Sequence, residues 1–202
     1  MCNNTKQQIP GKLIVVSAPS GAGKTTLVGA VLNRLNRQNM VLERVITYTT
    51  KEPGKSEISG GDYYFVSPEE FQEKINKDFF IEWSHVYGYY YGSPKSFLEN
   101  LKKGRSYIII VDRAGWQRIR EFPVATTSIW IEPPNLIILE QRLQLRSRDS
   151  LLEIKRRLAL ASQEIQDEQV CPLYHYKIVN DDFDRAIDQL EDIIDIELHM
   201  LV

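Results

Sequence analysis

The segment over residues 13–26, which reads LIVVSAPSGAGKTT, constrains the fold of this chain more than any other. It begins with a short β-branched apolar run, which predicts a buried strand over 13–16. Small residues follow over 17–23, and a Lys-Thr-Thr sequence then opens a helical pattern over 24–37. Strand, small-residue loop, Lys-Thr and helix in this order predict a P-loop, in which backbone N–H groups and a helix N-terminus surround an anionic phosphate.

This P-loop predicts a site for the phosphates of ATP. Lys24 is placed to reach the β- and γ-phosphates, and the Thr25 hydroxyl is placed to ligate Mg²⁺. The strict pattern asks for glycine at position 18, where this chain has Ala18. Asn180 follows the last predicted strand and is expected near the adenine. The expected ATP-binding residues are Ala18, Pro19, Ser20, Gly21, Ala22, Gly23, Lys24, Thr25, Thr26 and Asn180.

Composition narrows the class of protein. The chain has 202 residues, of which 43% are hydrophobic and 26% charged, which predicts one globular α/β domain. A formal net charge of −2 gives no reason to expect nucleic acid or a membrane as partner. The two cysteines form neither a disulfide framework nor a metal-ligand spacing, so we expect a cytoplasmic protein. Residues 1–10 are expected to form a disordered tail, with no signal peptide.

Strands and helices alternate along the predicted chain, which indicates a doubly wound parallel sheet. We expect helices over 24–37, 68–77, from Ser93-Pro94 to 104, and over 135–145, 151–167 and 183–199. We expect strands over 13–16, 41–49, 63–66, 79–87 and 107–111, one ending at 131, and a last one over 176–179. Two stretches interrupt the alternation, a β-rich one near 45–93 and an arginine-rich one near 142–157. Both are expected above the carboxyl ends of the sheet, where such folds bind ligands.

Several segments together resemble the guanylate kinase family, from Leu13 to the last helix. They are SAPSGAGKTT, TYTT at 47–50, GGDYYFV at 60–66, FIEW at 80–83, YYGS at 90–93, the arginine-bearing stretch 142–157, and IVNDDFD at 178–184. The resemblance implies a P-loop NTPase core with a β-rich nucleoside-monophosphate (NMP) insertion and a short helical lid. It implies transfer of the γ-phosphoryl group of ATP to GMP or dGMP. We assign the core to 11–44, 95–138 and 168–202, the GMP-binding subdomain to 45–94, and the lid to 139–167.

The resemblance also implies a guanine site. Guanine presents N1–H and an exocyclic amine on one edge, and a carboxylate accepts both hydrogen bonds, so Glu82 is the expected base reader. Asp112 matches the family's second guanine-contacting acid, and Ser93 matches its small hydroxyl residue. A site of this kind rejects bases that lack the matching polar groups.

The acceptor phosphate is expected at Thr47, Lys51, Tyr63 and Tyr91, which match the family's positions. Here the chain departs from the family pattern TTR-x-P-R-x-G-E, because Lys51 and Gly54 replace the two arginines. Lysine is a point charge and lacks the planar fork that grips a phosphate with two hydrogen bonds.

A second departure lies in the family motif DxDxQG, where this chain has Ile110 in place of the first acid and Ala114 in place of the glutamine. Arg113 lies between them and is a candidate to compensate for a missing arginine. Arg142, Arg146 and Arg157 match the lid arginines, and with Lys24 they are the expected catalytic residues. They would close over the phosphates, exclude water and stabilise the transition state.

Two alternatives stay open. A kinase of the same fold could act on another phosphorylated acceptor, such as a ribose bisphosphate; the lost arginines and Ile110 favour this, while Glu82, Ser93 and Asp112 oppose it. A non-catalytic scaffold module is less compatible with the intact P-loop and lid arginines. The partners expected are ATP, GMP and Mg²⁺, and the chain is expected to act as a monomer or a homodimer.

Overall fold

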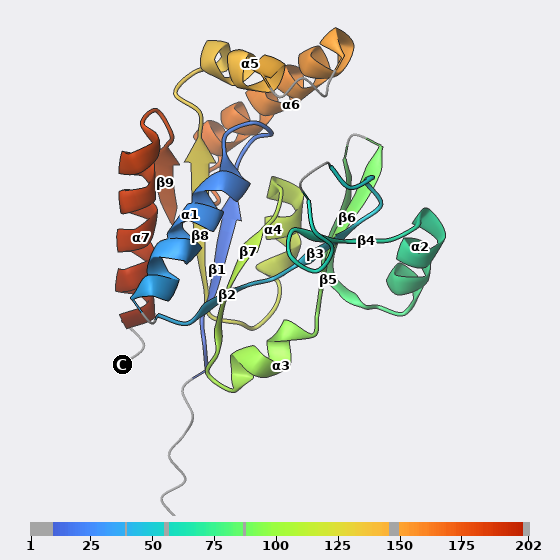
Figure 1. The fold of residues 1–202 in the computed structure, drawn as a ribbon, viewed down its shortest axis with the longest axis vertical. Coiled ribbons are helices and arrows are strands. Elements are labelled where there is room, and N and C mark those ends of the chain that lie inside the picture. The colour runs from blue at the N-terminus through green and yellow to red at the C-terminus, as the bar shows by residue number, and fades with distance from the viewer. Residues whose placement is uncertain (1–9, 39, 55–56, 87, 146–149, 200–202) are drawn as a thin grey trace, which may run out of the picture.

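The computed structural model describes residues 10–38, 40–54, 57–86, 88–145 and 150–199. The tail expected over 1–10 lies, apart from Pro10, outside the described residues. A parallel five-stranded sheet forms the centre of the structure (Figure 1). Its strands lie in the order β2-β7-β1-β8-β9, and they are β1 (Leu13–Ser17), β2 (Leu42–Arg44), β7 (Ser106–Ile110), β8 (Thr126–Glu132) and β9 (Tyr176–Val179).

Helices cover both faces of this sheet, which confirms the predicted doubly wound α/β fold. Every residue of β1 is buried, because Ile14 and Val16 point to one face and Leu13 and Val15 to the other. The first face packs against α1 (Lys24–Arg37) and α7 (Phe183–His199), and the second against α3 (Phe97–Lys102) and α4 (Arg113–Ile119). Strand β1 is thus fixed from both sides, and so is the start of the loop that follows it.

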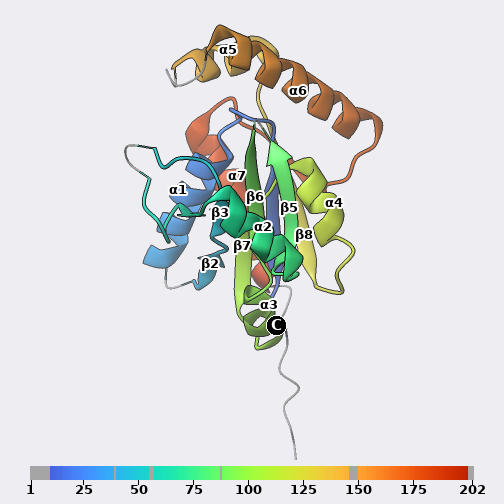
Figure 2. The ribbon, with the colours of Figure 1, turned by 90° about the vertical axis from the view of Figure 1, so that its right-hand side faces the viewer.

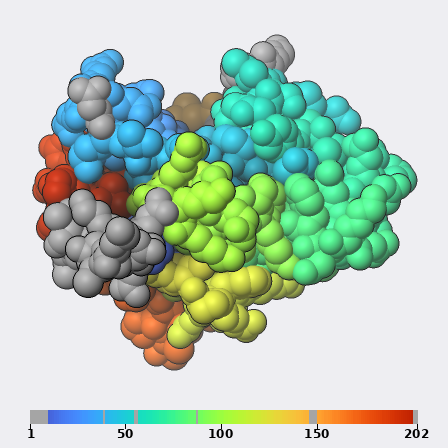
Figure 3. Space-filling model, turned by 90° about the horizontal axis from the view of Figure 1, so that it is seen from below, coloured from blue at the N-terminus to red at the C-terminus, as the bar shows by residue number. Residues whose placement is uncertain are grey.

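A second sheet lies beside the core and has the order β4-β3-β6-β5. Its strands are β3 (Thr47–Thr49), β4 (Tyr63–Phe65), β5 (Phe80–Val86) and β6 (Tyr89–Pro94). Helix α2 (Pro68–Asn76) covers one face, and it begins with the predicted capping box of Ser67 and Glu70. Seen from below, this part of the chain lies beside α3 and on the opposite side of the molecule from α7 (Figure 3).

Strand alternation separates two faces of the second sheet. Thr47, Tyr63 and Tyr91 point to one face, while Tyr48 and Gly92 point to the α2 face. A Cβ on Gly92 would lie 2.9 Å from ring atoms of both Phe71 and Phe80, so only glycine fits against this aromatic layer. The expected acceptor residues therefore share the face that α2 leaves open.

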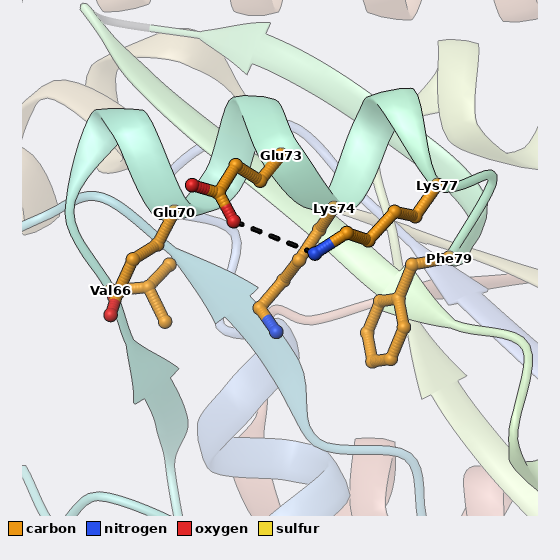
Figure 4. Close-up of a pocket in the computed structure, with 6 residues that line it drawn as sticks. All are labelled: Val66, Glu70, Glu73, Lys74, Lys77 and Phe79. Atoms are coloured by element: carbon orange, nitrogen blue, oxygen red, sulfur yellow. Dashed lines mark ion pairs between the residues drawn. The ribbon is translucent and has the colours of Figure 1, made fainter.

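A cavity of about 260 Å³ lies on the α2 face (Figure 4). Glu73 and Lys77 form an ion pair at 3.5 Å on its rim, and Lys74 Nζ lies 4.7 Å from the Phe79 ring centroid. Lys74 also lies over the ring of Tyr48, which points away from the acceptor residues. The cavity is thus on the other side of the sheet from the expected site.

Three sequence predictions need correction. The single strand expected over 41–49 is two strands in different sheets, β2 beside β7 and β3 between β4 and β6, with the chain crossing at Val45. Ser93 and Pro94 do not begin a helix but end β6, where they pair with Glu82 and Phe80. Helix α4 was not predicted, because it is short and only its Asp112 cap marks it in the sequence.

Helices α5 (Leu136–Leu145) and α6 (Leu151–Val170) cross above the carboxyl end of the central sheet (Figures 1 and 2). Leu139 and Leu143 of α5 pack against Ile154 and Ala161 of α6, and this small apolar cluster holds the two helices together. Helix α6 begins at the capping box of Ser150 and runs to Val170, beyond the predicted end at 167. Among the described residues, no helix is both long and apolar enough to cross a membrane.

Candidate active site

The loop between β1 and α1 has the backbone bends that phosphate binding requires. Gly21 and Gly23 have φ angles of 92° and 100°, a region that side-chain-bearing residues rarely adopt. Asn180 fixes the loop from the far side, because its Nδ2 donates to the carbonyl oxygen of Ala22 at 2.8 Å. A Cβ on Gly23 would lie 2.6 Å from that Nδ2. Asn180, expected near the adenine, therefore contacts the loop backbone directly.

Lys24 lies at the mouth of this loop. Its Nζ donates to the carbonyl oxygen of Ala18 at 2.6 Å and to that of Pro19 at 3.3 Å. Thr25 follows at the start of α1 and is exposed. In the part of the chain that the structure describes, no three His, Cys, Asp or Glu side chains form a metal site. The exposed hydroxyl of Thr25 beside the phosphate loop is chemically compatible with Mg²⁺, which keeps most of its waters and takes substrate phosphates with one or two protein ligands.

Two carboxylates and a hydroxyl meet where the second sheet reaches the core. Glu82 is 4% exposed, and its Oε1 accepts a hydrogen bond of 2.6 Å from Ser93 Oγ on the paired strand. Asp112 caps α4 and accepts from the Gly115 N–H at 2.7 Å. A Cβ on Gly115 would lie 2.8 Å from Glu82 Oε2 and 3.3 Å from Asp112 Oδ1. Glycine at 115 therefore lets the two expected guanine readers approach each other.

Burial dominates the charge state of Glu82. Removal from water raises its pKa most, the Ser93 hydrogen bond and the Arg118 charge lower it, and the Asp112 charge raises it, so that the net pKa is about 7. A buried carboxylate with one oxygen already satisfied can accept hydrogen bonds from two adjacent N–H groups. It discriminates strongly, because a base without those donors leaves the buried charge unpaired.

The expected phosphate-binding residues line the open face of the second sheet. The rings of Tyr63 and Tyr91 lie 6.2 Å apart, and Thr47 is buried on the strand that pairs with β4. Lys51 Nζ lies 5.1 Å from the Tyr63 ring centroid and 2.7 Å from both carboxylate oxygens of Glu57. The cation is thus at the expected place, and Glu57 neutralises it there.

Of the three expected lid arginines, Arg157 contacts the P-loop, and Arg142 contacts Asn180, whose side chain binds the loop backbone. Arg142 Nη2 donates to the carbonyl oxygen of Asn180 at 2.9 Å, and its buried Nη1 has no partner among the described residues. Arg157 Nη1 donates to Ser20 Oγ at 3.3 Å, and the Arg157 charge acts on Tyr91, whose pKa burial raises to about 12. Arg157 therefore contacts the P-loop, and its charge also acts on a tyrosine of the acceptor face. Arg146 lies outside the described residues.

Arg113 does not compensate for a missing acceptor arginine. Its guanidinium turns away from the acceptor face, pairs with Glu168 near the end of α6, and donates to the carbonyl oxygen of Cys171 at 2.8 Å. Ile110 ends β7 and is half-buried, and it packs against the core cluster on the α1 side. The structure thus leaves Lys51 as the cation beside Tyr63.

Sequence reasoning missed Glu164. Burial raises the pKa of this half-buried carboxyl to about 7, and Lys24 and Asp112 are among the charges that act on it. Glu164 shares a helix face with Arg157 and Glu168, because the intervals between them are seven and four residues. That periodicity could have identified the inner face of α6 from the sequence.

Comparisons with known proteins agree with this geometry. Residues 10–197 match the family described as guanylate kinase. The guanylate kinase of Nitrosospira multiformis is 41% identical over 190 residues, covering 93% of this chain and 87% of that protein. That of Myxococcus xanthus is 42% identical over 187 residues, covering 92% and 86%. The crystal structure of guanylate kinase from Anaplasma phagocytophilum superposes with a TM-score of 0.75 at 30% identity, covering 95% of this chain and 88% of the other.

Proposed function

This chain belongs to the guanylate kinase family, and on that premise we propose that it transfers the γ-phosphoryl group of ATP to GMP, giving ADP and GDP. One observation carries the proposal: the Glu82–Ser93 pair lies against Asp112, which follows β7, the strand paired with the β1 strand that leads into the intact P-loop. Phosphoryl transfer needs little covalent chemistry from a protein, so positions and charges carry the mechanism.

On the donor side, the loop of small residues binds the β- and γ-phosphates through its backbone, and Lys24 supplies a positive charge. The Lys24 ammonium donates to two carbonyl oxygens of the loop, contacts that it can exchange for phosphate oxygens. Thr25 would hold Mg²⁺ together with the nucleotide. A bound Mg²⁺ would supply positive charge that neutralises the phosphates during transfer.

On the acceptor side, Glu82 accepts the two guanine donors, and Asp112 and Ser93 complete the base site. Thr47, Lys51, Tyr63 and Tyr91 hold the phosphate of GMP. An oxygen of that phosphate then attacks the γ-phosphorus, and the bond to the bridging oxygen of ADP breaks. The charge of Arg157 acts on Tyr91, which supports a position of the acceptor phosphate on the side of the lid arginines.

The lid helices complete the site. Arg142 and Arg157 neutralise the charge that spreads over the transferred group, and Arg146 is proposed to join them when the nucleotides are bound. The buried Nη1 of Arg142 supports this role, since a buried donor is stabilised by an anionic acceptor. The thiol of Cys171 is exposed and unpaired among the described residues, which supports our proposal of a cytoplasmic location. We also propose that the chain acts as a monomer or a homodimer.

A phosphoryl-transfer assay across a panel of acceptors tests the proposal. ADP formation is measured with GMP, dGMP, AMP, CMP, UMP and ribose 1,5-bisphosphate at saturating ATP and Mg²⁺. We expect kcat/KM for GMP to exceed that for AMP by about 100-fold or more, since AMP leaves the buried carboxylate unpaired. Preference for the ribose bisphosphate, or no transfer to any acceptor, would overturn the proposal.

A further inference from the structure

Arg113 holds the C-terminal end of α6, the helix whose inner face carries Arg157. Its ion pair with Glu168 is well shielded, with side chains 12% and 8% exposed. It also donates to the carbonyl oxygen of Cys171 at 2.8 Å, which places a cation beside the last carbonyls of the helix. Glu168 in turn accepts from the Leu173 N–H at 2.9 Å. One guanidinium therefore joins α4, the end of α6 and the segment that leads into β9.

Among the described residues, Arg113 Nη2 also donates to the carbonyl oxygen of Asp167 in α6 at 3.4 Å, and α4 makes a further contact with the segment that follows α6. Trp116, one turn after Arg113, donates from Nε1 to the carbonyl oxygen of Leu173 at 3.1 Å. Next to these contacts a cavity of about 320 Å³ separates the helices, with Gln117 of α4 and Gln163 of α6 among its lining residues. Figure 2 shows α4 beneath the C-terminal part of α6. The cavity leaves α6 room to pivot once the charged contact is removed.

Such a pivot would act on Arg157 through the length of the helix. Glu168 and Arg157 lie on one face of α6 and about 16 Å apart along its axis at 1.5 Å per residue. A rotation of about 10° at the Glu168 end would displace Arg157 by about 3 Å, by simple lever geometry. The contact of Arg157 with Ser20 is 3.3 Å long, so this displacement would break it. Phosphoryl transfer is sensitive to shifts of this size.

We propose that Arg113 is a positioning residue for phosphoryl transfer, which keeps Arg157 over the P-loop by holding the C-terminal end of α6. Asp112, its neighbour, contacts the acceptor base site, so the same turn of α4 serves both the guanine and the lid. The proposal rests on the catalytic role proposed above for Arg157.

A double-mutant cycle tests this proposal on the full chain, with Arg113→Gln, Arg157→Ala and the double variant. We expect Arg113→Gln to lower kcat by about 10-fold in the wild-type background. In the Arg157→Ala background the same change should lower kcat less than about 2-fold, because the residue that it positions is gone. A residue that only stabilises the fold would lower activity by the same factor in both backgrounds, and that result would overturn the proposal.

Two further variants keep the outcome interpretable. Arg120→Gln removes an exposed arginine at the C-terminal end of the same helix and should leave kcat within about 2-fold of wild type. Glu168→Gln removes the ion pair from the α6 side and serves as the test if Arg113→Gln fails to fold. It should lower kcat by about 10-fold as well, and that loss should likewise be non-additive with the loss caused by Arg157→Ala. An unchanged kcat in either Arg113→Gln or Glu168→Gln would overturn the proposal. An unchanged kcat in Arg157→Ala alone would refute the role of Arg157 instead.

Discussion

Replacing Glu82 with glutamine tests the base site most directly. The change keeps the shape of the side chain and exchanges one carboxylate oxygen for an NH₂ group. Ser93 Oγ donates to Oε1 at 2.6 Å, so the glutamine carbonyl should keep that contact, and the NH₂ should then take the place of Oε2. Guanine would meet a donor where it needs an acceptor.

The size of the effect follows from burial. Glu82 is 4% exposed, so water cannot reach in to satisfy the opposed donors. One hydrogen bond to a charge is lost and one buried donor is left unpaired, which together cost on the order of 2–4 kcal/mol of transition-state stabilisation. At 1.36 kcal/mol for each factor of ten, kcat/KM for GMP should fall about 30- to 1000-fold.

The pH dependence gives a second measurement on the same residue. Two guanine donors need the deprotonated carboxylate, and burial raises the pKa of Glu82 to about 7. In the wild type, kcat/KM for GMP should therefore rise as pH increases through about 7 and be lower on the acid side. Glu82→Gln has no such group, so its profile should lose this rise.

Steady-state kinetics with GMP varied and ATP saturating, from pH 5.5 to about 9, measures both effects. Calorimetric binding of an ATP analogue is the control, and its Kd should match that of the wild type because the P-loop is untouched. If Glu82→Gln used GMP as well as the wild type does, or kept the same pH profile, Glu82 would not read the base.

Three further predictions concern other parts of the chain. Lys24→Ala should lower kcat by about 1000-fold or more without unfolding the protein; near-normal turnover with ATP and Mg²⁺ would contradict the donor site. Lys51→Arg should lower the KM for GMP by about 3- to 10-fold, because a fork can contact Glu57 and the phosphate together; an unchanged or higher KM would show that Lys51 does not hold the phosphate. Glu197→Gln should reduce the free energy of unfolding by about 1–3 kcal/mol at pH 7, because Glu197 accepts from Lys12 and two hydroxyls, which hold its pKa at about 2. Urea unfolding of the wild type should show this extra free energy of unfolding above about pH 4.5 and its loss as the pH falls towards 2. If the free energy of unfolding of Glu197→Gln depended on acid pH in the same way as that of the wild type, the stabilising role of Glu197 would be refuted.

The P-loop is the part of the protein that its sequence determined by itself. A β-branched run, two glycines with positive φ, and a Lys-Thr pair at a helix start act on neighbours in the chain, so 13–26 folds as the sequence predicts. The capping boxes of α2 and α6 also depend only on residues close in the chain, and both were predicted from the sequence. Glu82 and Ser93 were each assigned to the guanine site through the family resemblance, and the hydrogen bond between them was not predicted.

Tertiary structure decided the rest. The stretch 41–49 is rich in β-branched residues and was predicted as one strand, yet β7 binds its first half and β4 and β6 bind its second, because a strand's hydrogen-bond partners come from distant segments. Arg113 illustrates the same limit. The preceding residue, Asp112, caps α4 and lies against Glu82. Because successive residues of a helix point about 100° apart, Arg113 does not share that direction and pairs with Glu168 instead. Proximity in sequence suggested the acceptor site, and the packing of α6 against α4 determined which site Arg113 serves.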